Sequence, residues 1–106
     1  MEKKIFDLLG LARRSGNIFI GQDKVLENCR NMPLLVLVSR DCSDNVLRSI
    51  RNAVAAGKAE MIQLDTDREE LGKAVGVQAA QTVALDRTGG FAKKIFSLVN
   101  RSDADE

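Results

Sequence analysis

Apolar residues recur along the chain at two spacings, one typical of α-helices and one typical of β-strands. Five stretches, beginning near residues 2, 22, 44, 67 and 89, place apolar residues three and four positions apart, as on one face of a helix. Four short apolar runs, at residues 18–20, 34–39, 61–64 and 82–85, lie between them and have the length of strands. The pattern therefore predicts five helices and four strands that alternate along the chain.

Turn residues and capping side chains predict where these helices begin and end. The apolar stripe of the second helix extends to Met32. Residues that disfavour a continuing helix follow the first four helices: Gly16, Pro33, Gly57 and Gly76. Side chains that can accept a hydrogen bond from a helix N-terminus precede the last three: Ser43 or Asp44, Thr66 with Glu69 three residues later, and Thr88.

Helices that alternate with strands are typical of a sheet that is covered on both faces. The run at residues 34–39 is apolar on successive positions, so we expect it to be buried on both faces. We predict a three-layer α/β/α sandwich with four strands, formed by a single domain at residues 1–100. Residues 101–106 hold one arginine and three acidic residues, and we predict that they form a flexible acidic tail.

The composition argues against several classes of chemistry. The chain has no histidine, tryptophan or tyrosine, two cysteines and four phenylalanines. Zinc sites and Ser-His or Cys-His catalytic pairs would lack their usual residues, and sheet platforms that stack bases would lack their aromatic rings. The acidic residues at 65–70 are explained as the start of a helix, where carboxylates are favourable. We therefore predict a protein that is not an enzyme and that has no metal and no cofactor.

The sequence also bears on location. No apolar stretch approaches the ~20 residues that span a bilayer, and no signal-peptide core is present. Cys29 and Cys42 lie in no metal-ligand spacing, and Cys29 falls on an apolar stripe that indicates a core position. We predict reduced thiols, a cytoplasmic location and no membrane partner.

Basic residues gather around the first two predicted helices. The chain has sixteen basic and fifteen acidic residues, so its net charge is only +1. Arg13 and Arg14 end the first helix, Gly21 precedes the second, and Lys24 lies in the first turn of the second. A cation at a helix start is unfavourable, so Lys24 is explained either by phosphate contact or by pairing with Glu27, which would also reach Arg30.

Four segments together carry a resemblance to a known family. They are Gly-Leu-Ala-Arg-Arg-Ser-Gly at 10–16, Gly-Gln-Asp-Lys-Val-Leu-Glu at 21–27, Glu-Leu-Gly-Lys-Ala-Val-Gly at 70–76 and Gly-Phe-Ala-Lys-Lys at 90–94. Their order and spacing resemble the L-seven-Ae / L-thirty-e ribosomal protein superfamily, and within it the small bacterial members of the YlxQ type. The resemblance covers residues 2 to about 99 and implies a mixed four-stranded sheet.

The same resemblance implies binding to kink-turn RNA and a set of RNA-binding residues. The Gly-x-Asn-Glu-x-x-Lys motif of the family falls on Gly21, Gln22, Asp23, Lys24 and Glu27. The family's covering loop, which covers a nucleotide that has left the stack, falls on Val77, Gln78, Ala79 and Ala80. Arg68 matches a basic position before the fourth helix, and Arg13 and Arg14 complete the expected site. The implied partners are structured RNA, ribosomal RNA in particular, and ribosomal proteins, bound by a monomer.

Three positions depart from the motif of the family. Asp23 stands where asparagine is usual, so a group that only accepts hydrogen bonds replaces a donor. Lys24 and Glu27 invert the charges at their positions. These departures leave open an altered RNA target, RNA binding completed by a partner, and a protein-interaction module on the same scaffold. An enzyme of unknown type is a further alternative, and no residue pattern supports it.

Overall fold

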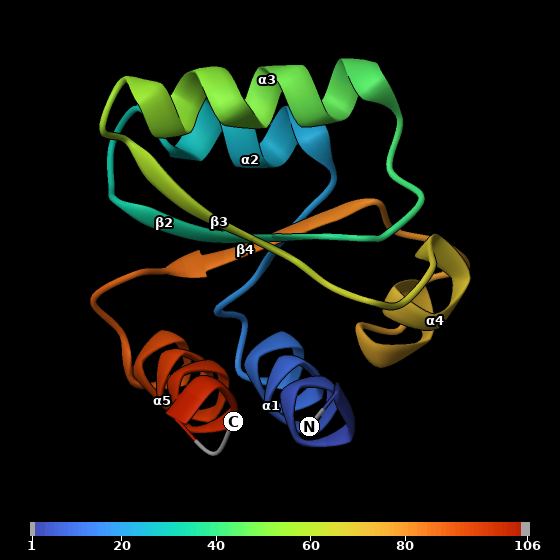
Figure 1. Ribbon diagram of the computed structural model, residues 1–106. Coiled ribbons are helices and arrows are strands. Elements are labelled where there is room, and N and C mark those ends of the chain that lie inside the picture. The colour runs from blue at the N-terminus through green and yellow to red at the C-terminus, as the bar shows by residue number, and fades with distance from the viewer. Residues whose placement is uncertain (1, 105–106) are drawn as a thin grey trace.

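The computed structural model describes residues 2–104 of the chain, and five helices alternate with four strands over this range (Figure 1). The elements are α1 (Glu2–Arg14), β1 (Phe19–Ile20), α2 (Gln22–Asn28), β2 (Leu34–Val38), α3 (Asp44–Ala55), β3 (Ala59–Gln63), α4 (Arg68–Ala74), β4 (Thr82–Asp86) and α5 (Gly90–Ala104). The alternation predicted from the apolar pattern is confirmed.

The four strands form one mixed sheet in the order β1-β4-β2-β3. β2 and β3 are parallel, and β4 runs antiparallel to both β1 and β2. Helices α2 and α3 cover one face of the sheet, α1 and α5 cover the other, and α4 lies beyond one end of the strands (Figure 1). The fold is therefore the predicted three-layer sandwich, with the mixed sheet that the family resemblance implies.

The core lies on both faces of β2, whose five residues are all buried. Successive side chains of a strand point to opposite faces. Leu35 and Leu37 accordingly pack in one cluster with the α1 and α5 layer, whereas Leu34, Val36 and Val38 pack in another with α2 and α3. The expectation that this strand is buried on both faces is confirmed, and the buried centre fixes the positions of the strand ends.

Two of the predicted helix caps are wrong and one is confirmed. Ser43 caps α3, since its side chain accepts the N–H of Val46. Asp67 rather than Thr66 caps α4 and accepts the N–H of Glu70 at 2.8 Å. Thr66 is drawn into the core, 5% exposed, because its carbonyl receives the N–H of Arg40 from the loop after β2.

Thr88 is likewise not the cap of α5. Its backbone N–H and its hydroxyl both donate to Oδ1 of Asp86, which forms a turn of the kind that aspartate favours. The carbonyl of Gly89 accepts the first helical hydrogen bond, from Lys93. The hydroxyl of Thr88, which the sequence predicts to cap α5, is therefore bonded to Asp86 at the end of β4.

The ends of α2 and α5 also differ from the expected ranges. α2 ends at Asn28, so Met32 lies in the turn that leads to β2 rather than on the helix. α5 continues to Ala104, four residues into the segment 101–106. Residues 105 and 106 lie outside the described residues, and the flexibility of the tail stays a prediction.

Candidate functional site

The start of α2 is anchored to the start of β4 through Gly21. Its N–H donates to the carbonyl of Thr82 at 2.9 Å, and its own carbonyl accepts the N–H of Val25 at 3.1 Å. Gly21 has φ 96°, in the left-handed region, which a side chain would disfavour. The glycine at this position therefore lets the chain turn from β1 into α2 while it remains bonded to β4.

This anchor brings the predicted covering loop beside α2. Gly21 and Gln22 line a shallow pocket of about 280 Å³ together with Arg68, Ala79, Ala80 and Thr82. Three predicted site segments therefore share one surface, although the start of α2 is more than forty residues from Arg68 and from the covering loop in the sequence. Val77 and Gln78 are not among the lining residues, since Val77 packs against the core and Gln78 is exposed outside the pocket.

Gly72 determines how the covering loop sits on α4. The loop folds back so closely that a Cβ atom at Gly72 would lie 2.6 Å from the Cα of Ala79. The N–H of Val77 donates to the carbonyl of Gly72, and the N–H of Ala80 donates to the carbonyl of Arg68. The glycine is thus required by the close approach of two backbones, a role that the family-like segment at 70–76 did not reveal.

Arg13 and Lys24 lie on a second hollow beside the first, of about 360 Å³, between α1, β1 and α2. A Cβ atom at Gly76 would lie 3.1 Å from Nη1 of Arg13, so the guanidinium group reaches the end of α4. Within residues 2–104, neither Arg13 nor Lys24 forms an ion pair. Both cations are exposed and are therefore available to an anionic ligand.

The other charged residues of α2 do not neutralise Lys24. Asp23 and Glu27 are exposed, and in the described part of the chain no ion pair joins Glu27 to Lys24 or to Arg30. The pairing considered as an explanation of Lys24 is therefore not formed. Gln22 turns toward α3 instead, and its Nε2 donates to Oγ of Ser49 at 3.0 Å.

Arg14 stands apart from the rest of the predicted site. Its Nε donates to the carbonyl of Gly10 one turn earlier at 3.5 Å, and its side chain is exposed. It lines neither of the two hollows, whereas the neighbouring Arg13 does. The two arginines point to different sides of α1 because successive helical residues are rotated by about 100°.

Arg68 is held by Asp41, a residue that the sequence did not single out. Oδ1 of Asp41 accepts the N–H of Arg68 at 2.9 Å and Oδ2 accepts its Nε at 3.2 Å, while Nη2 donates to the Asp41 carbonyl at 2.6 Å. Desolvation acts to raise the pKa of Asp41, but hydrogen bonds from Ser39 and Arg68 and the guanidinium charge outweigh it and lower that pKa. The pair fixes the start of α4, and the negative charge of Asp41 offsets much of the positive charge that Arg68 presents to a ligand.

The floor of the first hollow holds a second residue that the sequence did not single out. Thr82 is 1% exposed, and its hydroxyl has no hydrogen-bond partner among the described residues. Beside it, Oε1 of Gln81 accepts the N–H of Ser43 at 2.7 Å. A buried hydroxyl without a partner is costly unless something else bonds to it, so Thr82 offers the hollow a polar contact.

The two cysteines show no sign of catalytic activation. Cys29 is buried in the core as predicted, and its Sγ donates to the carbonyl of Leu26. Desolvation and the nearby charge of Asp41 raise the pKa of the Cys42 thiol, so it stays protonated at neutral pH. Across residues 2–104 no three side chains of the metal-ligating types gather in one place, and no helix is long and apolar enough to cross a membrane.

Comparisons with known proteins find a sequence relative and many solved structures of similar fold. The chain is 33% identical over 96 residues to the RNA-binding protein YlxQ of Bacillus subtilis (strain 168), a match that covers 90% of this chain and 94% of the relative. A protein of unknown function from Bacillus halodurans superposes with a TM-score of 0.82 at 23% identity, over 92% of this chain and 97% of that one. The 15.5kD RNA binding protein of Giardia lamblia gives 0.74 at 15% identity, over 97% and 88%. No protein-family model matches the chain.

Proposed function

The chain belongs to the YlxQ group of the L-seven-Ae / L-thirty-e superfamily, and from this membership we propose that it is a non-catalytic protein that binds structured RNA. The relative from Bacillus subtilis is named an RNA-binding protein, and the match spans nearly the whole of both chains. The RNA that fits the site best is a kink-turn, and the cellular setting that fits it is a ribonucleoprotein such as the ribosome.

One observation carries the proposal, namely the meeting of three distant segments at one edge of the sheet. The start of α2, the end of α1 and the loop before β4 line two adjoining hollows. Arg13 and Lys24 stand on one of them without ion pairs in the described range. Two unpaired cations beside a hollow suit a sharply bent backbone, because its phosphates lie close together and contacts to them fix the register of the protein.

Polar groups near these cations can contact the bases. Asp23 is exposed and accepts hydrogen bonds, so the imino and amino groups of a guanine can donate to it. The hollow floored by Thr82 and walled by Ala79 and Ala80 suits a nucleotide that has left the stack, since it offers apolar contact and one unused hydroxyl. Recognition by shape and a few polar contacts agrees with the low aromatic content of the chain.

A mobility-shift titration tests the RNA target. It compares a kink-turn RNA with the same strand pair in which the G·A pairs are replaced by Watson–Crick pairs. We expect the kink-turn to bind more tightly, and binding to fall as salt is raised, because phosphate contacts release counterions. Equal affinity for both duplexes would contradict kink-turn recognition, and no binding of either would contradict the RNA proposal itself.

Substitution of Lys24 tests the site. Lys24→Glu reverses an exposed, unpaired charge, so we expect the kink-turn to bind about fivefold more weakly or worse, which corresponds to ~1 kcal/mol or more for a charge-assisted contact. Arg51→Glu is the matched control, since Arg51 is an exposed residue of α3 that lines neither hollow. Equal effects of the two substitutions would remove Lys24 from the interface.

Sedimentation tests whether the protein associates with the ribosome. If it does, we expect the protein to co-sediment with ribosomal particles at low salt and to dissociate from them at high salt.

The second candidate function is a protein-interaction module, which the inverted charges at Lys24 and Glu27 favour. A specific partner that is still retained after nuclease treatment would favour this second candidate, whereas loss of every partner would favour RNA.

A further inference from the structure

The helical layer formed by α1 and α5 carries most of the excess positive charge of the molecule. By sequence the two helices hold seven basic residues and three acidic ones, Glu2, Asp7 and Asp103. They include these exposed basic residues: Lys3, Lys4, Arg13, Arg14, Lys93 and Lys94. Acidic and basic residues are nearly balanced over the rest of the described chain. A layer with this charge attracts a polyanion rather than a typical protein partner, because lysine is depleted at protein–protein interfaces.

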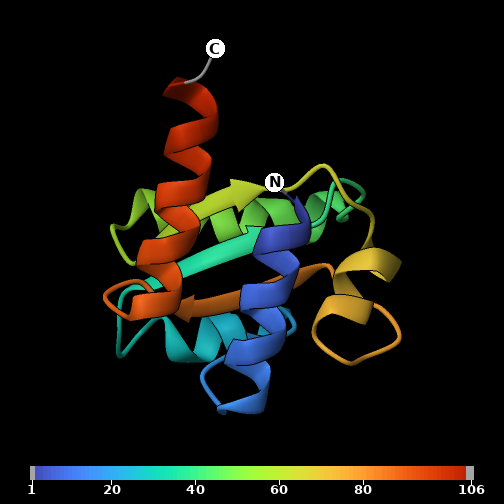
Figure 2. The same ribbon diagram turned by 90° about the horizontal axis from the view of Figure 1, so that it is seen from below.

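The two helices leave a groove between them. α1 and α5 lie side by side on the same face of the sheet (Figure 2). One hollow of about 330 Å³ is lined by Lys4, Asp7 and Leu8 of α1 and by Lys94, Ser97 and Leu98 of α5, so two cations and one carboxylate face it. Lys94 also lines a larger hollow of about 520 Å³ at the start of α5, so the two hollows adjoin at this residue.

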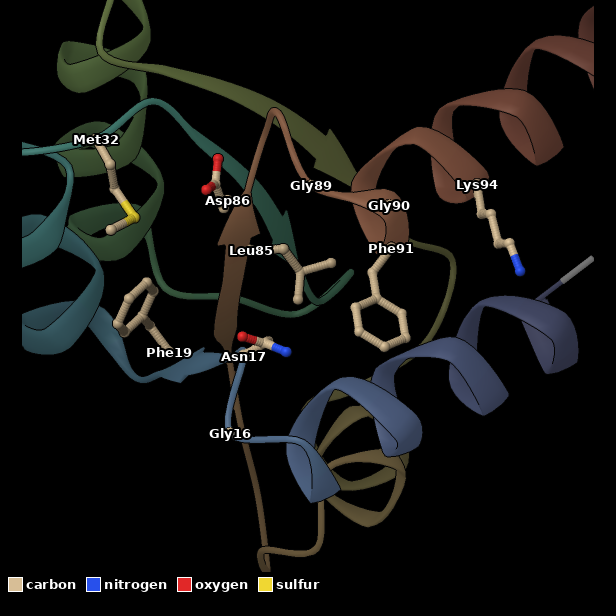
Figure 3. Close-up of a pocket in the computed structure, with 10 residues that line it drawn as sticks. All are labelled: Gly16, Asn17, Phe19, Met32, Leu85, Asp86, Gly89, Gly90, Phe91 and Lys94. Atoms are coloured by element: carbon tan, nitrogen blue, oxygen red, sulfur yellow. The ribbon is translucent and has the colours of Figure 1, made fainter.

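The larger hollow has one aromatic ring on each side of β4. Phe91 of α5 packs with the α1 and α5 layer, whereas Phe19 of β1 packs with α2 and α3, and each ring is half-buried (Figure 3). These are two of only four phenylalanines in the chain. Asn17 and Asp86 add polar groups to the rim, and hydrogen bonds from Thr88 lower the pKa of Asp86, so its carboxylate is ionised and accepts hydrogen bonds at neutral pH.

We propose that the groove between α1 and α5 is a second RNA-contact surface, which holds a single-stranded segment along Lys4 and Lys94 and stacks one unpaired base on Phe91. Sequence-tolerant binding of single strands combines a basic track with aromatic rings on which bases stack, and this groove has both. The Asp86 carboxylate accepts from the amino or imino groups of such a base. The low aromatic content argues against an extended stacking platform, but one ring, Phe91, is enough to stack one base.

The tested residues of this surface are separate from those of the site proposed above, although the two surfaces adjoin at Gly16 and Phe19. Phe91 and Lys94 line neither hollow of the first site, and Lys24 lines neither hollow of the groove. Thr82 and Asp86, at the two ends of β4, are roughly 13 Å apart at a rise of about 3.3 Å per residue. Substitutions at Lys24 and at Lys94 therefore test the two surfaces independently.

Fluorescence anisotropy with two labelled RNAs separates the surfaces. One probe is an unstructured single-stranded RNA of about ten nucleotides, and the other is a blunt kink-turn hairpin without single-stranded ends. We expect Lys94→Glu to weaken the single-stranded probe at least about fivefold and to reduce the slope of log K against log salt by about 0.7 for each lost phosphate contact. The same substitution leaves the blunt hairpin unaffected, whereas Lys24→Glu weakens it.

Two further variants keep the test decisive. Phe91→Leu keeps an apolar side chain in the hollow but removes the ring, so it weakens the single-stranded probe while thermal unfolding shows the protein still folded. Arg51→Glu makes the same charge change on the opposite face of the sheet and serves as the control. The proposal is overturned if the wild-type protein binds the hairpin but not the single strand, or if Lys94→Glu and Phe91→Leu bind the single strand as well as Arg51→Glu does.

Discussion

At the scale of single residues, two glycines in helices have opposite roles. A Cβ atom at Gly72 of α4 would approach the Ala79 backbone to 2.6 Å, and no side-chain rotation can relieve that contact. A Cβ atom at Gly10 of α1 would lie 3.5 Å from the carbonyl of Ala74, an ordinary van der Waals distance. Identical substitutions at the two positions should therefore have effects of opposite sign.

The glycine pair gives a prediction for stability and binding. Gly72→Ala should lower the free energy of unfolding by ~1–3 kcal/mol and weaken RNA binding, because the loop before β4 must move. Gly10→Ala should raise it by ~0.5–1 kcal/mol, because alanine favours the helix and meets no clash. Urea denaturation of both variants measures the difference, and a Gly72→Ala protein as stable as the wild type would contradict the close packing of the loop.

At the scale of elements, the start of α4 shows what local sequence can and cannot predict. Thr66 and Glu69 have the spacing of a capping box, yet the cap is Asp67. The sequence predicts the start of α4 to within one residue. It does not predict which residue is the cap, because several polar residues near that start could accept the hydrogen bond. The choice between them depends on the loop after β2, whose Arg40 bonds the Thr66 carbonyl and draws Thr66 into the core.

The two candidate caps predict different effects of substitution. Asp67→Ala should lower the free energy of unfolding by ~1 kcal/mol, since it removes the acceptor of the Glu70 N–H. Thr66→Val should leave stability unchanged or raise it, since it replaces a buried hydroxyl that has no partner in the described chain. Thermal unfolding of both variants checks the assignment, which would be wrong if Thr66→Val proved the more damaging change.

At the scale of the whole molecule, periodicity predicts the layers but not the meeting of the site segments. Alternation of helix and strand was enough for the sandwich, because each element must bury its apolar face against another layer. The convergence of Gly21 with the loop before β4 depends on β4 pairing between β1 and β2, a pairing that no local pattern specifies. The family resemblance supplied that information for α2 and for the loop, but it indicated neither Asp41 nor Thr82, and it did not reveal the packing role of Gly72.

The stability of the whole fold should decline in acid. The folded state lowers the pKa values of Asp41 and Asp86, so protons bind these carboxylates more weakly when the protein is folded than when it is unfolded. Their contribution is therefore complete above the unfolded pKa near ~3.9 and is lost as the pH falls through the lower folded values. Denaturation measured from pH 7 down to pH 2 should show a fall in wild-type stability that is shallower in Asp41→Asn. Equal slopes in the two proteins would mean that the Arg68 contact does not favour the charged carboxylate.

The placement of β4 has a consequence for the choice of RNA. This strand is paired on both sides and buried over its first four residues, so it cannot stretch or slide. A rigid strand with Thr82 at one end and Asp86 at the other holds the two contact regions at a fixed separation. An RNA that engages both regions must present its bend and its unpaired arm at that separation. Selection among transcripts would then depend on the spacing between two shapes more than on the order of their bases.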